Sequence, residues 1–226
     1  DALATAPTDY SNAGQDLSAA SATVVLSSLD TLANGDFLLL GAHLPFRGVL
    51  VDVNATNSTG SNSTLAVKYT RRNAITGCAT SDSGTKTIIT STHGLTNSDL
   101  VTITGTVHYN GIWTVEQVVG TTTFVIPTPF YVSETAGFAT SWSDITPTDG
   151  TTAGSKTFGT DGNVTWTVPT DWGKIKLSEL YTATGSKTYN NSLYWTRWDV
   201  SAANDSSVTL DRMLALNRNT GNYSEL

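Results

Sequence analysis

Residues 99–115 have the sequence Asp-Leu-Val-Thr-Ile-Thr-Gly-Thr-Val-His-Tyr-Asn-Gly-Ile-Trp-Thr-Val, and this stretch decides the fold class of the chain. Val101 and Ile103 alternate with threonines, as in a half-buried β-strand whose successive side chains point to opposite faces. Asn110 and Gly111 predict a tight hairpin turn, because both residues tolerate a positive φ. The stretch therefore predicts short antiparallel strands joined by tight turns.

The strand pattern continues on both sides of this stretch, from residue 85 to residue 138. Its further elements are Lys86-Thr87-Ile88-Ile89-Thr90, His93-Gly94-Leu95 and Thr123-Phe124-Val125-Ile126. Together with the Tyr-Asn-Gly-x-Trp-Thr-Val motif at 109–115, they resemble the small β module that recurs as an insertion in structural proteins of tailed bacteriophages. The resemblance implies that residues 85–138 form a small all-β domain inserted between two strands of another domain.

The residues on either side of this segment show a second resemblance. They include Phe46-Arg47-Gly48-Val49, Ser63 to Tyr69, Asp149-Gly150-Thr151, Gly162 to Pro169, Asp171-Trp172 and Tyr194-Trp195-Thr196-Arg197. These residues look like a jelly-roll-type virion domain of phages. In that family a strand like the one ending at Tyr69 continues at once into a short aromatic hairpin, which appears here only at 141–145. The resemblance implies that residues 22–84 and 139–226 form one discontinuous jelly-roll-like β-sandwich, and it transfers no catalytic residue.

The first residues of the chain differ in composition from the rest. Residues 1–21 are rich in Ala, Ser and Thr and lack apolar periodicity. Such a composition is typical of an extended arm that becomes ordered against a neighbouring subunit. We therefore expect an N-terminal arm over 1–21.

The residues that follow 138 also favour strands. Val164, Trp166 and Val168 alternate with threonines, which places three bulky side chains on one face of a strand, and Pro169 ends it because proline has no N–H to donate. Only residues 174–181 hint at a helix. Many short strands, frequent turns and almost no helical period predict an all-β sandwich.

A last strand is predicted over 207–216. One of its faces has four apolar residues and a charge, namely Val208, Leu210, Leu214, Leu216 and Arg212. A charge in such a row must pair or reach solvent. Two interpretations stay open for Arg212, an edge position and an ion pair across a subunit interface.

Composition excludes some classes of function. The chain has 226 residues, of which 14% are charged, with 12 Lys and Arg against 19 Asp and Glu and a net charge of -7. Phosphate binding needs clustered basic residues, so no nucleic-acid partner is expected. The one adjacent basic pair, Arg71-Arg72, is interpreted as a solvated turn rather than a polyanion contact.

The cysteine count and the hydropathy pattern set further limits. Cys78 is the single cysteine, so no intrachain disulfide is possible. Its Gly- and Ser-rich surroundings favour a structural or bystander thiol over a nucleophile. No run of about 18 apolar residues exists, so we expect no transmembrane helix and no membrane partner.

Three Asn-x-Ser/Thr sequons begin at Asn54, Asn57 and Asn62. They are interpreted as part of a solvated turn, because a phage protein does not meet the glycosylation machinery; only a eukaryotic source would favour glycosylation.

No set of residues has the spacing of a known catalytic or metal site. The histidines, His43, His93 and His108, lack the HExxH spacing, and a structural role is favoured for each. Asp149, Asp161 and Asp171 suggest a glycosidase or a calcium site, but two of them belong to Asp-Gly turn dipeptides. We expect no catalytic residue, no cofactor-binding residue, no metal ligand and no cofactor.

The six tryptophans raise a separate possibility, a sugar-stacking platform. On the predicted strand around residue 195, Trp195 and Arg197 project to one face, and Tyr194, Thr196 and Trp198 to the other. Core or interface packing is the favoured interpretation of these rings. If Trp195 and Trp198 are both buried, glycan binding through this strand is excluded.

These observations lead to one expectation and two alternatives. We expect a non-enzymatic structural component of a phage virion, such as a capsid decoration, a head spike or a tail surface protein. It would lie on the particle surface, self-associate as a homo-oligomer and dock on capsid or tail subunits. The alternatives are a carbohydrate-binding or host-adhesion module, with host-surface glycans as partners, and a glycan-cleaving enzyme.

Overall fold

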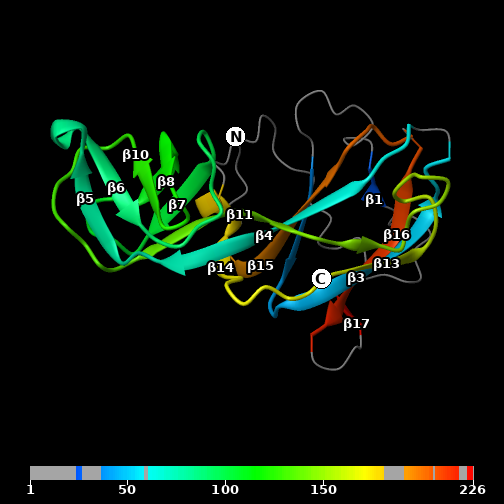
Figure 1. Ribbon diagram of the computed structural model, residues 1–226. Coiled ribbons are helices and arrows are strands. Elements are labelled where there is room, and N and C mark those ends of the chain that lie inside the picture. The colour runs from blue at the N-terminus through cyan, green and yellow to red at the C-terminus, as the bar shows by residue number, and fades with distance from the viewer. Residues whose placement is uncertain are drawn as a thin grey trace. The chain divides into compact units, whose positions relative to one another are not determined.

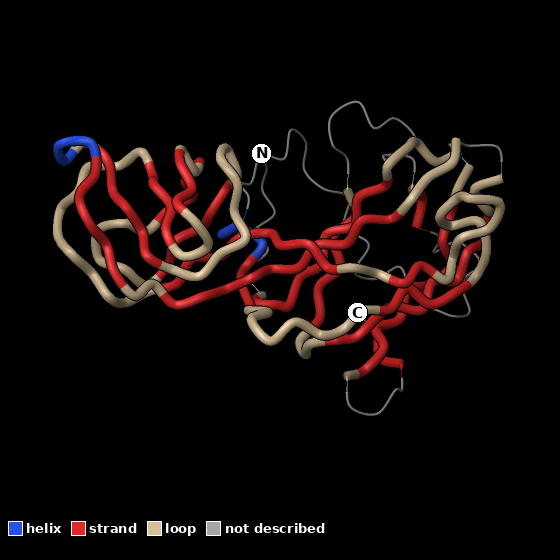
Figure 2. Tube along the Cα trace, viewed as in Figure 1, coloured by secondary structure: helices blue, strands red, loops and turns tan. Residues whose placement is uncertain are grey.

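The computed structural model of this chain describes residues 24–26, 37–58, 61–180, 191–205, 207–218 and 223–225. Throughout these residues the protein is all-β, with antiparallel pairing and two very short helical turns (Figure 1, Figure 2). The predicted all-β class is therefore confirmed. The expected arm over 1–21 lies outside the described residues.

The elements are numbered along the chain as in Figure 1. They are β1 (Val24–Val25), β2 (Leu38–Ala42), β3 (Phe46–Ala55), β4 (Leu65–Ala74), β5 (Gly77–Ser81), the 3-10 turn η2 (Asp82–Gly84), β6 (Lys86–Thr90), β7 (Leu100–Thr104), β8 (Gly111–Thr114), β9 (Gln117–Val119), β10 (Thr123–Ile126), β11 (Phe138–Ile145), β12 (Thr148–Asp149), β13 (Gly162–Thr165), β14 (Lys174–Lys176), α1 (Leu177–Leu180), β15 (Ser192–Val200), β16 (Thr209–Asn217) and β17 (Tyr223–Glu225).

The chain divides into two compact units. Of the described residues, unit 1 contains 70–143, 171–180 and 191–193, and unit 2 contains the rest. The chain passes from one unit to the other within β4 and again within β11. Unit 1 is thus larger than the segment 85–138, and an independent domain over 85–138 stays a prediction.

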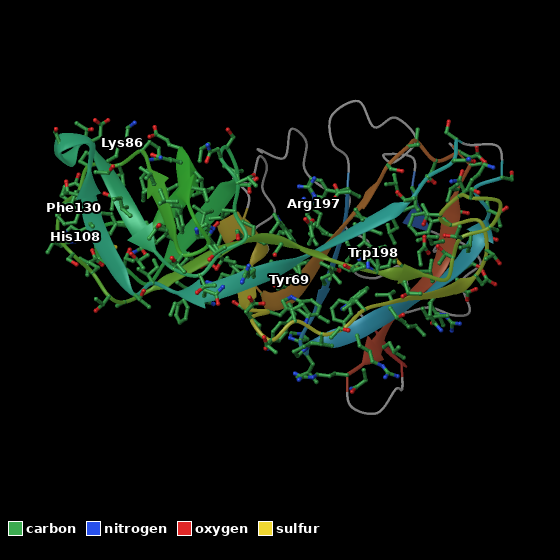
Figure 3. The ribbon with its side chains drawn as sticks, in the orientation of Figure 1. Tyr69, Lys86, His108, Phe130, Arg197 and Trp198 are labelled. Carbon is green, nitrogen blue, oxygen red and sulfur yellow. The ribbon has the colours of Figure 1, made fainter. Side chains whose placement is uncertain are left out.

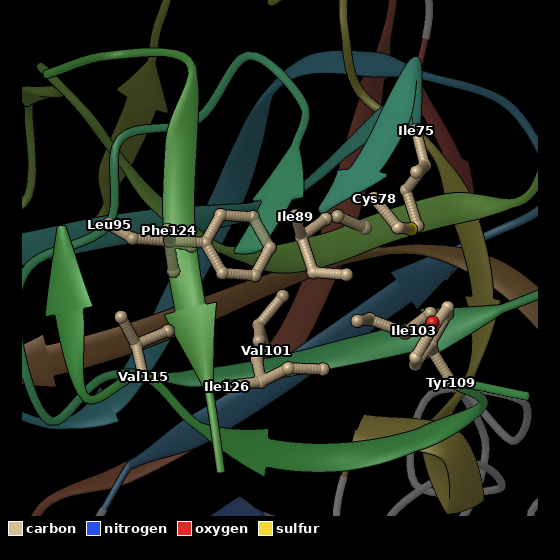
Figure 4. Close-up of a cluster of buried hydrophobic side chains, with 11 residues drawn as sticks. Ile75, Cys78, Ile89, Leu95, Val101, Ile103, Tyr109, Val115, Phe124 and Ile126 are labelled. Atoms are coloured by element: carbon tan, nitrogen blue, oxygen red, sulfur yellow. The ribbon is translucent and has the colours of Figure 1, made fainter. Parts of the chain in front are cut away.

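Unit 1 is built from two sets of antiparallel strands. One is a four-stranded sheet with the order β5-β6-β10-β9. In the other, β7 pairs with β11 on one side and with β8 on the opposite side. Side chains from both sets meet in one buried core, so unit 1 is sandwich-like (Figure 4).

The core of unit 1 follows the alternation of its strands. Its buried side chains are Ile75, Cys78, Ile89, Leu95, Val101, Ile103, Tyr109, Val115, Phe124, Ile126 and Ala139. Burying each large apolar side chain contributes about 1.5–3 kcal/mol relative to leaving it in water. The predicted strand and the burial of Val101 and Ile103 are confirmed, but the strand is not half-buried, since Thr102 on its other face is buried too. The Thr102 hydroxyl donates to the Glu179 carbonyl at 2.6 Å.

The turn between β7 and β8 differs from the prediction. The strands pair from Leu100↔Thr114 to Ile103↔Gly111, so the loop is longer than two residues. Gly111 has a φ of +149°, but Asn110 is not among the residues with positive φ. The Asn110 side chain instead accepts from the N–H of Thr106 at 3.0 Å and donates to the carbonyl of Thr106 at 2.6 Å. The prediction of a tight Asn-Gly turn was therefore wrong, because the Asn110 side chain closes a wider loop.

Unit 2 contains a six-stranded antiparallel sheet with the order β1-β16-β3-β13-β12, in which β17 also pairs with β16. A second group pairs β15 with β2 and with the first residues of β4. Its core includes an aromatic cluster in which Trp166 lies edge-on to Phe46 at 5.5 Å and to Trp198 at 6.3 Å. Val164 and Trp166 are buried as predicted, but β13 ends at Thr165 rather than at Pro169, and Val168 is only half-buried.

The predicted face of the last strand was wrong. In β16, Leu210 pairs with Val53 and Arg212 pairs with Asp52, with a β-bulge between them. Val53 and Asp52 are neighbours on β3 and point to opposite faces, so the bulge places Leu210 and Arg212 on opposite faces. Arg212 pairs with Asp52 at 3.1 Å on the adjacent strand of the same chain.

The helix hinted at over 174–181 is present only in part. Residues 174–176 form β14, and α1 is a single turn from Leu177 to Leu180 that is buried at both ends.

Candidate interaction site

The three histidines lie in different settings. His43 is exposed before β3. His93 is buried in unit 1, where its Nε2 lies 3.1 Å from the Thr123 carbonyl and its Nδ1 accepts the N–H of Leu95 at 3.2 Å. His108 is exposed in the β7–β8 loop and belongs to the cluster described below.

Structural hydrogen bonds occupy each candidate carboxylate. In unit 2, Asp149 accepts the hydroxyls of Thr151 at 2.6 Å and Thr157 at 2.7 Å, and Asp161 accepts the N–H of Val53 at 2.7 Å.

The remaining carboxylate, Asp171 in unit 1, forms an ion pair with Arg71 at 2.7 Å. The turn predicted at Arg71 and Arg72 was wrong, since both lie within β4. The Arg72 guanidinium lies over the Phe138 ring at 4.2 Å.

Two other residues are more buried than the sequence suggests. Cys78 lies in β5 and in the core of unit 1 rather than in a loop, and burial raises the pKa of its thiol. This setting makes the thiol a poor nucleophile.

Asn57 is buried and donates to the Thr157 carbonyl at 3.1 Å, so the solvated-turn interpretation was wrong for this sequon.

Within the described ranges, no group of three or more His, Cys, Asp or Glu side chains is arranged to hold a metal ion. No described helix has the length and apolar character to cross a bilayer.

The tryptophans do not provide a sugar platform on β15. Trp198 is 1% exposed and Trp195 is 9% exposed, although they project to opposite faces of the strand. Trp198 also donates its ring N–H to the Thr196 hydroxyl at 3.1 Å. Because a sugar stacks only on an exposed ring, neither tryptophan of β15 is available for stacking.

The most unusual surface of unit 1 is an exposed apolar patch, defined here as Val107, Tyr131 and Val132. These side chains are 81%, 62% and 46% exposed. Val107 lies in the β7–β8 loop, and the other two lie in segment 127–137 between β10 and β11. Figure 3 labels His108 and Phe130, the chain neighbours of Val107 and Tyr131, close together in this part of unit 1.

A buried tyrosine holds the backbone of the apolar patch. Tyr109 is fully buried, and its hydroxyl donates to the carbonyl of Val132 at 2.6 Å. The same hydroxyl accepts the N–H groups of Tyr131 at 3.1 Å and Val132 at 3.0 Å. A single phenol therefore satisfies three backbone groups of a segment that has no strand ladder of its own.

The carboxylate of Glu134 binds the backbone of the β7–β8 loop, which carries Val107 of the apolar patch. Glu134 accepts the N–H of Val107 at 2.7 Å, the N–H of His108 at 3.0 Å and the Nδ1 of His108 at 2.9 Å. Burial alone would raise the pKa of Glu134, but these hydrogen bonds and the nearby imidazole outweigh it and hold that pKa below its ordinary value. The His108 ring in turn stacks on the Tyr131 ring at 5.5 Å with an interplanar angle of 18°.

This arrangement provides a preorganised contact surface. Its apolar side chains face solvent, while the hydrogen bonds beneath them keep both loops in place. Binding by such a surface costs little ordering entropy. The alternation of strands cannot identify it, because the residues lie between strands; the run Phe130-Tyr131-Val132 after two prolines was the available signal.

Comparison with protein families, with curated proteins and with solved structures finds no match to this chain.

Proposed function

We propose that this protein is a non-enzymatic structural component of a tailed-phage virion, which self-associates and docks on the particle. The observation that supports this proposal best is the apolar patch, because a folded protein that holds Val107, Tyr131 and Val132 rigidly in solvent has a surface suited to a protein partner.

The hydrogen bonds and ion pairs of the candidate catalytic residues support a non-enzymatic role. General acid–base work needs a carboxylate or imidazole free to approach a substrate. The carboxylates of Asp149, Asp161 and Asp171 are each occupied by neighbouring residues, and His93 is buried against backbone groups.

The arrangement of the chain supports the finer fold assignment, a jelly-roll-like sandwich interrupted by a small β domain. Residues 70–143 form one continuous stretch of unit 1, and the unit 2 segments precede and follow it in the chain. An insertion between two strands of a parent domain produces this order for 70–143, while residues 171–180 and 191–193 return to unit 1.

The proposal is tested by the solution mass of the purified chain, measured by light scattering over a range of concentrations, and by electron microscopy of the species that form. A closed oligomer or a regular lattice is the expected result. A chain that stays monomeric at high concentration would contradict the self-association.

A host-adhesion role is the second candidate, and one observation favours it. The Tyr131 ring is 62% exposed and is held against His108, so its free face is available for a sugar ring. A glycan array probed with the wild-type chain and with Tyr131→Ser tests this role, which requires wild-type binding that the substitution abolishes.

A further inference from the structure

Three of the six exposed large apolar side chains form the apolar patch. Among the described residues the six are Leu44, Val107, Val119, Tyr131, Val132 and Phe138. Phe138 is covered on one face by Arg72, and Leu44 and Val119 lie in separate loops or strands. Only the apolar patch combines several such side chains on neighbouring segments.

The contacts beneath the apolar patch fix its shape. Tyr109 binds both backbone groups of Val132, and Glu134 binds two successive N–H groups at Val107 and His108. These bonds cross between the β7–β8 loop and segment 127–137. The two loops therefore present the patch as one unit, and a partner meets a surface that is already ordered.

The charges around the apolar patch indicate which partner it fits. Residues 105–110 and 127–137 contain no Asp, Lys or Arg and only one His and one Glu, namely His108 and Glu134, whose Nδ1 and Oε1 atoms lie 2.9 Å apart. The whole chain has a net charge of -7. Contact through the acidic surface of this chain would bring like charges of two copies together, whereas the one carboxylate of these two segments, Glu134, has a side chain that is only 10% exposed.

The polar groups argue against a sugar as the main ligand. Asn110 is engaged with Thr106, and Glu134 already accepts three hydrogen bonds. A sugar bound here would find both of these side chains already engaged. An apolar protein surface can bind here without hydrogen bonds from these side chains.

We propose that the apolar patch is the self-association surface of this protein, and that its occupant is the same patch on a second copy of the chain. This inference rests on the proposed function, since it names the contact through which the predicted oligomer forms. An isologous contact of this kind places Val107, Tyr131 and Val132 of both copies around a two-fold axis.

Sedimentation equilibrium of the full chain tests the inference with Val107→Asp. The substitution places a carboxylate from each copy in the contact, and we expect the dissociation constant of self-association to rise about tenfold or more. Val119→Asp is the matched control, because Val119 is 54% exposed and pairs with Thr123 at the other end of β10. The control should leave the constant within about twofold of wild type.

A second variant covers the case in which Val107→Asp fails to fold, as judged by circular dichroism. Tyr131→Ser removes the largest exposed ring of the apolar patch and should weaken self-association in the same way.

The other outcomes separate the inference from the proposed function. If wild type and both patch variants form the same oligomer, the surface assignment is overturned and the proposed function stands. A wild-type chain that is monomeric at every concentration overturns both. Loss of glycan binding in Tyr131→Ser with an unchanged oligomer overturns the inference and assigns the patch to a sugar.

Discussion

At the scale of the residue, single buried polar groups hold loops that no strand ladder supports. Tyr109 lies at the centre of this arrangement, with its ring in the core and its hydroxyl bound to Tyr131 and Val132. In unit 2, the ring N–H of Trp166 donates to the carbonyl of Phe46, the first residue of β3, at 3.0 Å. Each aromatic residue thus contributes apolar burial and a directed hydrogen bond.

Tyr109→Phe should reduce the free energy of unfolding by about 1–3 kcal/mol, because two N–H groups and one carbonyl lose their partner. The ring volume is unchanged, so the packing term is small. Urea denaturation measures the effect, and Tyr131→Phe is the control because its ring is exposed. Equal losses in the two variants would show that the Tyr109 hydroxyl has no structural role.

Glu134 should make stability depend on pH. Its pKa in the folded protein lies below the ordinary 4.5, so its stabilising effect is present above the unfolded-state pKa and is lost as pH falls through the folded-state pKa. Glu134→Gln should therefore differ most from wild type at neutral pH and progressively less between about pH 5 and pH 2. Urea denaturation across this range gives the difference. A difference that does not change with pH would rule out the carboxylate charge as its source.

At the scale of the element, a β-bulge decides which side of β16 faces the core. The ladder to β3 shifts between Leu210 and Arg212, so alternation counted along the sequence fails beyond Leu210. Ala215 and Met213 then lie opposite Val49 and Val51. Strict alternation places a guanidinium in the core, and the bulge avoids this cost.

Leu210→Ala should cost about 2–5 kcal/mol of unfolding free energy, since the side chain is fully buried in unit 2. Arg212→Ala should cost about 1 kcal/mol or less, because its ion pair with Asp52 is one-third exposed on both sides. Chemical denaturation of the two variants under identical conditions compares them. Similar losses would mean that the two side chains share the buried face and that the bulge is absent.

At the scale of the whole molecule, the described residues form two units, each with its own core. The core of unit 1 has Phe124 and Ile89 near its centre, and that of unit 2 has the aromatic cluster around Trp198. Separate cores allow local opening of one unit while the other stays folded.

Phe124→Ala should cost about 3–5 kcal/mol and act mainly within unit 1. Hydrogen exchange should show faster exchange in β6, β7 and β10, with β3 and β16 nearly unchanged. Trp198→Ala, as the counterpart in unit 2, should give the reverse pattern. Equal acceleration in both units would show that the molecule unfolds as a single cooperative body.

The amino-acid sequence by itself determined the all-β class and the inward residues of individual strands, such as Val101, Ile103, Val164 and Trp166. These depend on a two-residue period and on local turn chemistry, both of which are short-range. Only the tertiary structure decided the bulge at β16, the strand location of Cys78 and Arg71, and the burial of Trp195.

The apolar patch belongs to the second group. Val107 and Tyr131 lie far apart in the sequence and outside any strand pattern, and they come together only because Tyr109 and Glu134 bind both loops. Long-range hydrogen bonds of this kind leave no periodic signal in the chain. The alternation of apolar residues therefore predicts the strands of this protein. Its proposed contact surface depends instead on how the loops between those strands meet.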